Sequence, residues 1–115
     1  MNQTNDICET KSIDLFRVKE FLKKYKPGEW IYPAVIQRNL KLYAKDAYAA
    51  LDALCEEGLI EQYYRIYCPY CQHYLNQFFR VVNEIPAEIS CEDCDNEITN
   101  PLEKTYLVYR MLKRN

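Results

Sequence analysis

Apolar residues recur at helical spacing near the start of the chain. Intervals of three or four residues separate Leu15, Val18, Leu22 and Tyr25, as on one face of a helix. Ser12 can cap the N-terminus of this helix, and Pro27-Gly28 would end it. Three more apolar side chains are expected to broaden the buried face: Ile13, Phe16 and Phe21.

Two further helices are predicted before the middle of the chain. The short, β-prone segment Trp30-Ile31-Tyr32 leads into a predicted helix from Pro33 to Leu40, with proline in its first turn. A longer helix is expected over residues 45–57, and Gly58 suits its C-terminal end. The buried stripe of this longer helix would consist of Ala47, Leu51 and Leu54.

The second half of the chain favours strands. Residues 59–67 and 74–83 are rich in aromatic and β-branched side chains, which is typical of a β-hairpin. Tyr106-Leu107-Val108-Tyr109 suits a last strand, although Asn100-Pro101 could equally begin a helix. Helices followed by strands predict an α+β fold.

Four cysteines punctuate this β-rich half in two pairs of the form C-x2-C. Cys68 and Cys71 form the first pair, Cys91 and Cys94 the second, and nineteen residues lie between the pairs. Two such turns can place four thiolates around one ion, so the spacing predicts a single structural Zn²⁺. A redox dithiol or two disulfides are the alternatives, but no βαβ pattern or export signal accompanies either pair.

The run from Ala47 to Tyr67, AYAALDALCEEGLIEQYYRIY, resembles the third helix and first wing strand of winged helix-turn-helix proteins. In those families a helix of the form Y-x-x-L-x-x-L-x-x-x-G-L-I turns at its glycine into a β-hairpin, the wing. The matching positions are Tyr48, Leu51, Leu54, Gly58, Leu59 and Ile60. The resemblance implies three helices and a hairpin, with the first cysteine pair at the tip of the wing.

A winged helix followed by a four-cysteine ribbon is similar in layout to archaeal transcription factor E and to many small prokaryotic regulators. The expected division is a flexible arm over residues 1–11, a winged helix over 12–67 and a zinc ribbon over 68–115. Cys8 falls in the arm, where no role is assigned to it, and Cys55 is expected to be a core residue.

Charge is unevenly distributed along the 115 residues, whose formal net charge is −2. Residues 1–60 are neutral, residues 61–100 carry five more acids than bases, and residues 101–115 carry three more bases than acids. Any contact with a polyanion is therefore expected on the first half of the chain or on its tail. The resemblance to winged helix-turn-helix proteins implies that this contact is with double-stranded DNA, through the third helix and its approach. The residues predicted to make it are Arg38, Lys41, Lys45, Tyr48 and Ala49.

The carboxylates of the third helix oppose DNA binding, so a protein-interaction role is the alternative. The chain would then be an adaptor or a small subunit of a multi-protein prokaryotic complex. Eleven tyrosines suit either a half-wet sheet or a contact surface. The tyrosines expected at a partner surface are Tyr63, Tyr64, Tyr67, Tyr70 and Tyr74.

Enzyme chemistry is not predicted. The sequence has one histidine, His73, and two glycines in total, with no phosphate-binding loop and no nucleophile beside a base. His73 could ligate metal, hydrogen-bond a cysteine sulfur or face solvent. No apolar run approaches a membrane span and no signal peptide is visible, so a cytoplasmic protein is expected. A homodimer is a further possibility, since two-fold dimers are common among winged-helix regulators.

Overall fold

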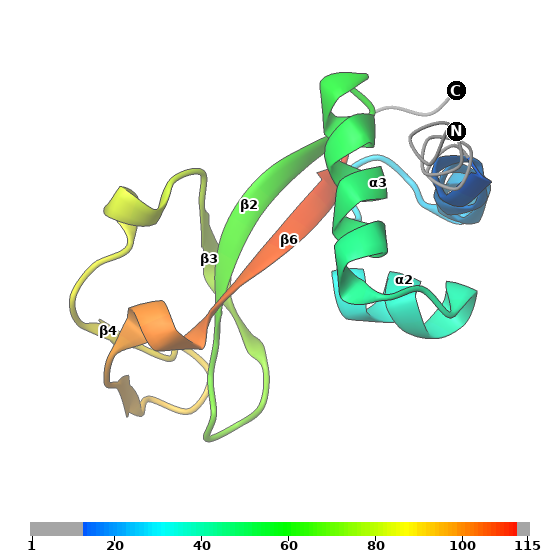
Figure 1. The fold of residues 1–115 in the computed structure, drawn as a ribbon. Coiled ribbons are helices and arrows are strands. Elements are labelled where there is room, and N and C mark those ends of the chain that lie inside the picture. The colour runs from blue at the N-terminus through cyan, green and yellow to red at the C-terminus, as the bar shows by residue number, and fades with distance from the viewer. Residues whose placement is uncertain (1–12, 113–115) are drawn as a thin grey trace, which may run out of the picture. The chain divides into compact units, whose positions relative to one another are not determined.

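Three helices, a four-stranded antiparallel sheet and a two-stranded hairpin form the α+β fold in the computed structural model, which describes residues 13–112 (Figure 1). The predicted fold class is confirmed, and the arrangement is compatible with a winged helix. Within residues 13–112, no helix is both long and apolar enough to cross a membrane. The predicted arm and Cys8 lie outside these residues.

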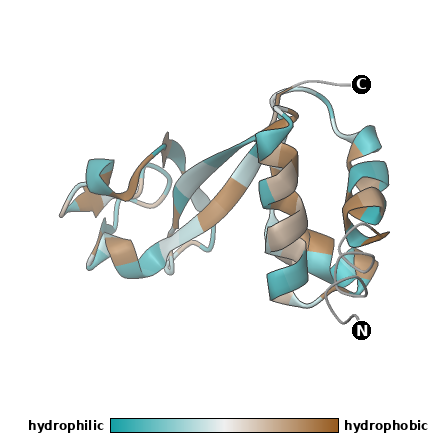
Figure 2. Ribbon diagram, turned by 45° about the horizontal axis from the view of Figure 1, so that its top comes forward, coloured by the Kyte–Doolittle hydropathy of each residue, from teal (hydrophilic) through white to brown (hydrophobic). Residues whose placement is uncertain are grey.

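The helices follow the predicted bounds closely. The first covers residues 13–21 and tightens into a 3-10 turn, η1 (Leu22–Lys24). After β1 (Trp30–Ile31) come α2 (Pro33–Leu40) and α3 (Ala44–Glu56). In Figure 2, hydrophobic and hydrophilic positions alternate along α3, as expected for an amphipathic helix.

A hydrophobic core joins the three helices. Val18 and Ile36 are fully buried, and on α3 the predicted stripe of Ala47, Leu51 and Leu54 is also fully buried. The prediction that Ile13 and Phe16 broaden the apolar face is wrong, because these side chains are 60% and 63% exposed. At 100° per residue they lie on the opposite side of the helix from Val18.

Five strands follow α3. Their bounds are β2 (Ile60–Tyr67), β3 (Tyr74–Phe79), β4 (Ile89–Ser90), β5 (Glu97–Ile98) and β6 (Thr105–Met111). The strand β3 ends four residues earlier than predicted, because the chain bends at Arg80 and enters a 3-10 turn, η2 (Val82–Glu84). A third 3-10 turn, η3 (Pro101–Lys104), precedes β6, so the proline initiates one turn and the strand follows it.

The order of the large sheet is β1-β6-β2-β3. The last strand, β6, pairs antiparallel with β1 and places Ile31 opposite Tyr109. The chain accordingly divides into two units: one comprises the described residues up to Glu61 together with those from Tyr109, and the other is Gln62–Val108. We call the first of these, which contains the three helices, the helical unit. The expected division into 12–67 and 68–115 is different, because the end of β6 belongs to the helical unit.

Candidate metal centre and nucleic-acid interface

The two cysteine pairs lie in turns with the same backbone hydrogen bonds. In the first turn the Cys68 N–H donates to the His73 carbonyl over 2.9 Å, and the Gln72 N–H donates to the Cys68 carbonyl over 2.9 Å. In the second turn, Cys91 and Asn96 form the bond equivalent to the first of these, over 2.9 Å. The shared hydrogen bonds indicate that both turns hold their cysteines in the same backbone geometry.

A left-handed residue closes each turn. Gln72 has a φ of 62° and Asp95 a φ of 64°, one residue after the second cysteine of each pair. Non-glycine residues adopt this conformation at a cost of about 1–2 kcal/mol. Both turns therefore contain the same strained backbone conformation at the same position. This strain is expected where two turns must hold their thiols in one geometry.

The four sulfurs converge. Cys68 Sγ lies 3.6 Å from Cys94 Sγ, and Cys71 Sγ lies 3.6 Å from Cys91 Sγ. All four atoms lie within 4.8 Å of one another. Four sulfurs bound to one ion at about 2.3 Å are about 3.8 Å apart, whereas a disulfide needs about 2.05 Å. The spacing fits a tetrahedral metal site and not a pair of disulfides, and all four of these cysteines are free thiols.

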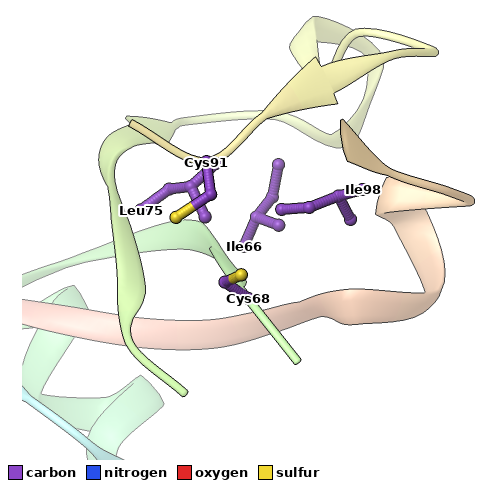
Figure 3. Close-up of a cluster of buried hydrophobic side chains, with 5 residues drawn as sticks. All are labelled: Ile66, Cys68, Leu75, Cys91 and Ile98. Carbon is purple, nitrogen blue, oxygen red and sulfur yellow. The ribbon is translucent and has the colours of Figure 1, made fainter. Parts of the chain in front are cut away.

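Apolar side chains surround this site. Ile66, Leu75 and Ile98 are buried together with Cys68 and Cys91 in one cluster (Figure 3). The cluster is the hydrophobic core of the unit Gln62–Val108, so the thiols occupy the place that packed side chains fill in a larger domain. A small core of this kind needs an added cross-link, and a metal ion can provide it.

Local hydrogen bonds favour a thiolate at the second turn. The Asn96 backbone N–H, and then its side-chain amide at 3.2 Å, lower the pKa of Cys94 to about 7. Burial, followed by a hydrogen bond with Cys91, instead raises the pKa of Cys71 to about 12. A bound cation would offset the cost of bringing thiolates together. The four thiols therefore suit a soft divalent ion.

His73 contributes its backbone to the first turn, and its side chain is exposed. A ring nitrogen of His73, a carboxylate oxygen of Asp93 and Cys71 Sγ lie within 4.8 Å of one another. His73 thus lies beside the four-thiol site, and the four cysteines by themselves are enough for a tetrahedral metal site.

The residues predicted to contact DNA surround the connection between α2 and α3. Arg38 lies in the last turn of α2, Lys41 follows it in a left-handed conformation, and Lys45 is in the first turn of α3. All three side chains are exposed, as is Ala49, whereas Tyr48 is half-buried. Among residues 13–112, none of the three cations forms an ion pair.

The carboxylates of α3 and its end are partly engaged elsewhere. Asp52 accepts a hydrogen bond of 2.9 Å from the Tyr109 hydroxyl, and Glu57 forms an ion pair of 3.3 Å with Lys19. Two of the acids that oppose a polyanion therefore have partners within the helical unit. Sequence periodicity shows which side of α3 is polar, but it does not reveal these long-range partners.

Tyr43 was not predicted as a site residue. It occupies the N-cap position of α3, between Lys41 and Lys45, and its side chain is 78% exposed. An exposed aromatic side chain between two exposed lysines is a candidate contact residue, and its position just before the helix is the sequence signal that points to it.

The tyrosines predicted at a partner surface do not form one patch. Tyr67 and Tyr74 face each other across β2 and β3, with ring centroids 5.1 Å apart. Tyr63 contacts Phe78 instead, and Tyr64 pairs with Phe79 on the side of the cysteine cluster. Tyr70 lies at the tip of the first cysteine turn and is 59% exposed.

Neither a protein-family model, nor a curated protein, nor a solved structure matches this chain significantly.

Proposed function

We propose that this chain is a zinc-stabilised winged-helix protein that binds double-stranded DNA as a cytoplasmic transcriptional regulator. The four cysteines hold one structural Zn²⁺. Because all four ligands come from the protein, the ion has no open position for water or substrate, which argues for a role other than catalysis. Free thiols at every described cysteine suit a reducing compartment.

The observation that carries this proposal is a group of three exposed cations at the α2–α3 connection, none of which forms an ion pair with another residue of 13–112. Arg38, Lys41 and Lys45 occur within eight residues of chain, where helix-turn-helix proteins approach the duplex. The N-terminus of α3 adds the positive end of a helix dipole at the same place. Phosphate neutralisation by such cations supplies most of the non-specific affinity for DNA.

The acidic character of α3 does not oppose this interface as strongly as its composition suggests. The Asp52 carboxylate accepts the Tyr109 hydroxyl, and Glu57 lies beside Lys19, at the far end of the helix from Lys45. Asp46 is the acid that remains near the N-terminus of α3, and it is half-buried. Duplex DNA would therefore meet mainly cations at the start of α3.

The test is a titration of the zinc-loaded chain with mixed-sequence duplex by fluorescence anisotropy at several salt concentrations. Wild type should bind more weakly as salt rises. The double variant Lys41→Glu/Lys45→Glu should lose binding, because two phosphate contacts are replaced by repulsion. Its affinity should also depend less on salt, because each removed phosphate contact lowers the salt slope by about one. The matched control is Lys24→Glu/Lys26→Glu, which makes the same charge change after the first helix. Unchanged affinity in the Lys41/Lys45 variant, or equal loss in the control, would contradict the assignment.

The alternative role, an adaptor or a small subunit of a larger assembly, is favoured by one observation. The unit Gln62–Val108 carries a group of aromatic side chains on its sheet, away from the proposed DNA-binding residues in sequence. This surface can act together with DNA binding or in place of it.

A further inference from the structure

A second group of potential metal ligands lies against the four-thiol site. Its members are the Cys71 Sγ, a ring nitrogen of His73 and a carboxylate oxygen of Asp93, and these atoms all lie within 4.8 Å of one another. Cys71 and His73 belong to the first cysteine turn, whereas Asp93 belongs to the second. The group therefore forms only where the two turns face each other, with Cys71 Sγ 3.6 Å from Cys91 Sγ.

This second group opens to solvent. Cys71 is half-buried and the side chains of His73 and Asp93 are exposed, whereas Cys68 and Cys91 are buried. Among residues 13–112, neither His73 nor Asp93 forms an ion pair, although their ligand atoms are within 4.8 Å of each other. Ligand atoms bound to one ion at about 2.0–2.3 Å are about 3.3–3.8 Å apart, so small rotations of two exposed side chains would bring them to one ion.

The immediate surroundings of this group are acidic. Neither turn, 68–73 or 91–96, contains Lys or Arg, while the second turn contains Glu92, Asp93 and Asp95. Glu92 is already engaged, because its carboxylate accepts a hydrogen bond of 2.6 Å from the Asn76 N–H. Four thiolates outweigh the charge of one Zn²⁺, so the four-thiol site stays anionic after it is filled. Attraction to the thiolates and to Asp93 would therefore offset the repulsion between two neighbouring cations.

The ligand types select a transition-metal ion. Sulfur and imidazole nitrogen favour Zn²⁺ and similar ions, whereas Mg²⁺ and Ca²⁺ prefer oxygen ligands. The Cys71 thiol must lose its proton to bind the structural ion, and the resulting sulfur keeps lone pairs with which it can bridge to another ion. Two metal ions about 3.5–4 Å apart recur in two-metal sites. Cys71 can therefore be a ligand of both ions.

We propose that Cys71, His73 and Asp93 bind a second Zn²⁺ or similar transition-metal ion, joined to the structural ion through the Cys71 sulfur. The proposal rests on the four-cysteine zinc site proposed above, because Cys71 is shared, and it is independent of DNA binding by α3. Three protein ligands leave a coordination position for water. The second ion is therefore held less tightly than the structural one, exchanges with solution, and binds only when Zn²⁺ is in excess.

The test is a titration of the full-length chain with Zn²⁺, followed by native mass spectrometry. One ion should remain after dialysis against metal-free buffer, and a second should bind in excess Zn²⁺. The variant His73→Ala/Asp93→Asn should keep the first ion and lose the second. The matched control is Tyr70→Ala/Asp95→Asn, which also changes one exposed side chain in each turn and removes one carboxylate charge. This control should bind both ions, and excess Mg²⁺ should not replace the second.

The outcomes distinguish this site from the structural one. A single ion in wild type at every Zn²⁺ concentration would overturn the second site and leave the four-cysteine site intact, whereas no bound zinc would contradict both. Two ions in His73→Ala/Asp93→Asn, or loss of the second ion in the control, would also overturn the assignment, because other groups would then hold the ion. Retention of the first ion and a dispersed ¹H–¹⁵N spectrum report that each variant is folded.

X-ray absorption at the zinc edge of frozen samples tests the shared sulfur. The protein with two ions should show a zinc–zinc distance of about 3.5–4 Å, and the protein with one ion should not. The mean number of sulfur ligands per zinc should also fall when the second ion binds, because only Cys71 supplies sulfur to it. If the zinc–zinc distance is absent with two ions bound, the bridge through Cys71 is wrong.

Discussion

Tyr109 shows how one side chain links strand and helix in the first unit. Its ring is fully buried, and its hydroxyl donates to the Asp52 carboxylate over 2.9 Å. Burial, then the hydrogen bond and charge of Asp52, raise the pKa of Tyr109 well above its usual value. If α3 binds DNA as we propose, the same contact also occupies a carboxylate that would oppose the phosphates. One hydrogen bond therefore stabilises the fold and, in our proposal, also reduces the repulsion between α3 and DNA.

Tyr109→Phe should lower the free energy of unfolding by about 1 kcal/mol near neutral pH, since one hydrogen bond is lost and the exposed Asp52 carboxylate is taken up by water. The raised pKa also makes a pH prediction. The stability from the neutral phenol is complete below the unfolded pKa of about 10 and is lost as pH rises above it towards the folded pKa.

Urea unfolding of wild type and Tyr109→Phe at neutral pH and above pH 10 measures both effects, because the two proteins differ in one titrating group. The difference in stability between them should shrink as pH rises. A difference that is constant or grows with pH would show that the phenol is not held in its neutral form by the fold.

The elements of this fold illustrate what local pattern can predict. Helix bounds follow from apolar spacing, from Pro33 in the first turn of α2 and from Gly58 after α3, and β1, α2 and α3 begin and end within a residue or two of expectation. The predicted cap Ser12 lies outside the described residues. The end of β3 was missed, because Val81 and Val82 favour a strand locally while the Arg80 N–H donates instead to the Glu84 carboxylate over 3.1 Å. Strand length is decided by pairing, which local propensity does not contain.

The edge of β3 is protected by acidic side chains, which leads to a prediction. As the last strand of the sheet, β3 would present free backbone groups, but the Asn76 N–H donates to the Glu92 carboxylate over 2.6 Å, and Arg80 is held by Glu84. Inserted charges of this kind prevent edge-to-edge pairing. Glu84→Ala/Glu92→Ala should therefore self-associate more than wild type at equal concentration.

Sedimentation equilibrium would measure this self-association. The control is Glu88→Ala/Glu97→Ala, which removes two exposed carboxylates that make no hydrogen bond to β3 among the described residues. Both variants make the same charge change. If both variants self-associate equally, the cause is the reduced net charge, and the acidic side chains at the edge of β3 do not prevent association specifically.

The stability of the whole unit Gln62–Val108 is expected to depend on its four thiols. Its buried cluster is small and includes two of the cysteines, so packing alone offers little stability. The helical unit has its own larger core, with Val18, Ile36 and Leu51 fully buried. Metal binding at a four-cysteine site contributes on the order of 10 kcal/mol, comparable with the total stability of a small domain.

Zinc removal should therefore unfold one unit and leave most of the helices. Native mass spectrometry should find one Zn²⁺ per chain, and a strong chelator or the variant Cys91→Ser should abolish it. In the ¹H–¹⁵N spectrum, resonances of 62–108 should collapse towards unfolded positions, while the far-UV helical signal largely persists. The control Cys55→Ser changes a half-buried cysteine in α3 and should keep the zinc. Full dispersion after chelation would contradict a structural role for the metal.

The amino-acid sequence by itself determined the features that depend on short intervals: the C-x2-C turns, the three helices and the β-rich second half. Spacing and propensity are local quantities, and they carry this information directly. Only the tertiary structure decided that β6 pairs with β1, that Asp52 meets Tyr109, and that the tyrosines of β2 divide between two faces. Each of these joins residues that are distant in sequence or depends on strand register, which is set by packing against the rest of the molecule.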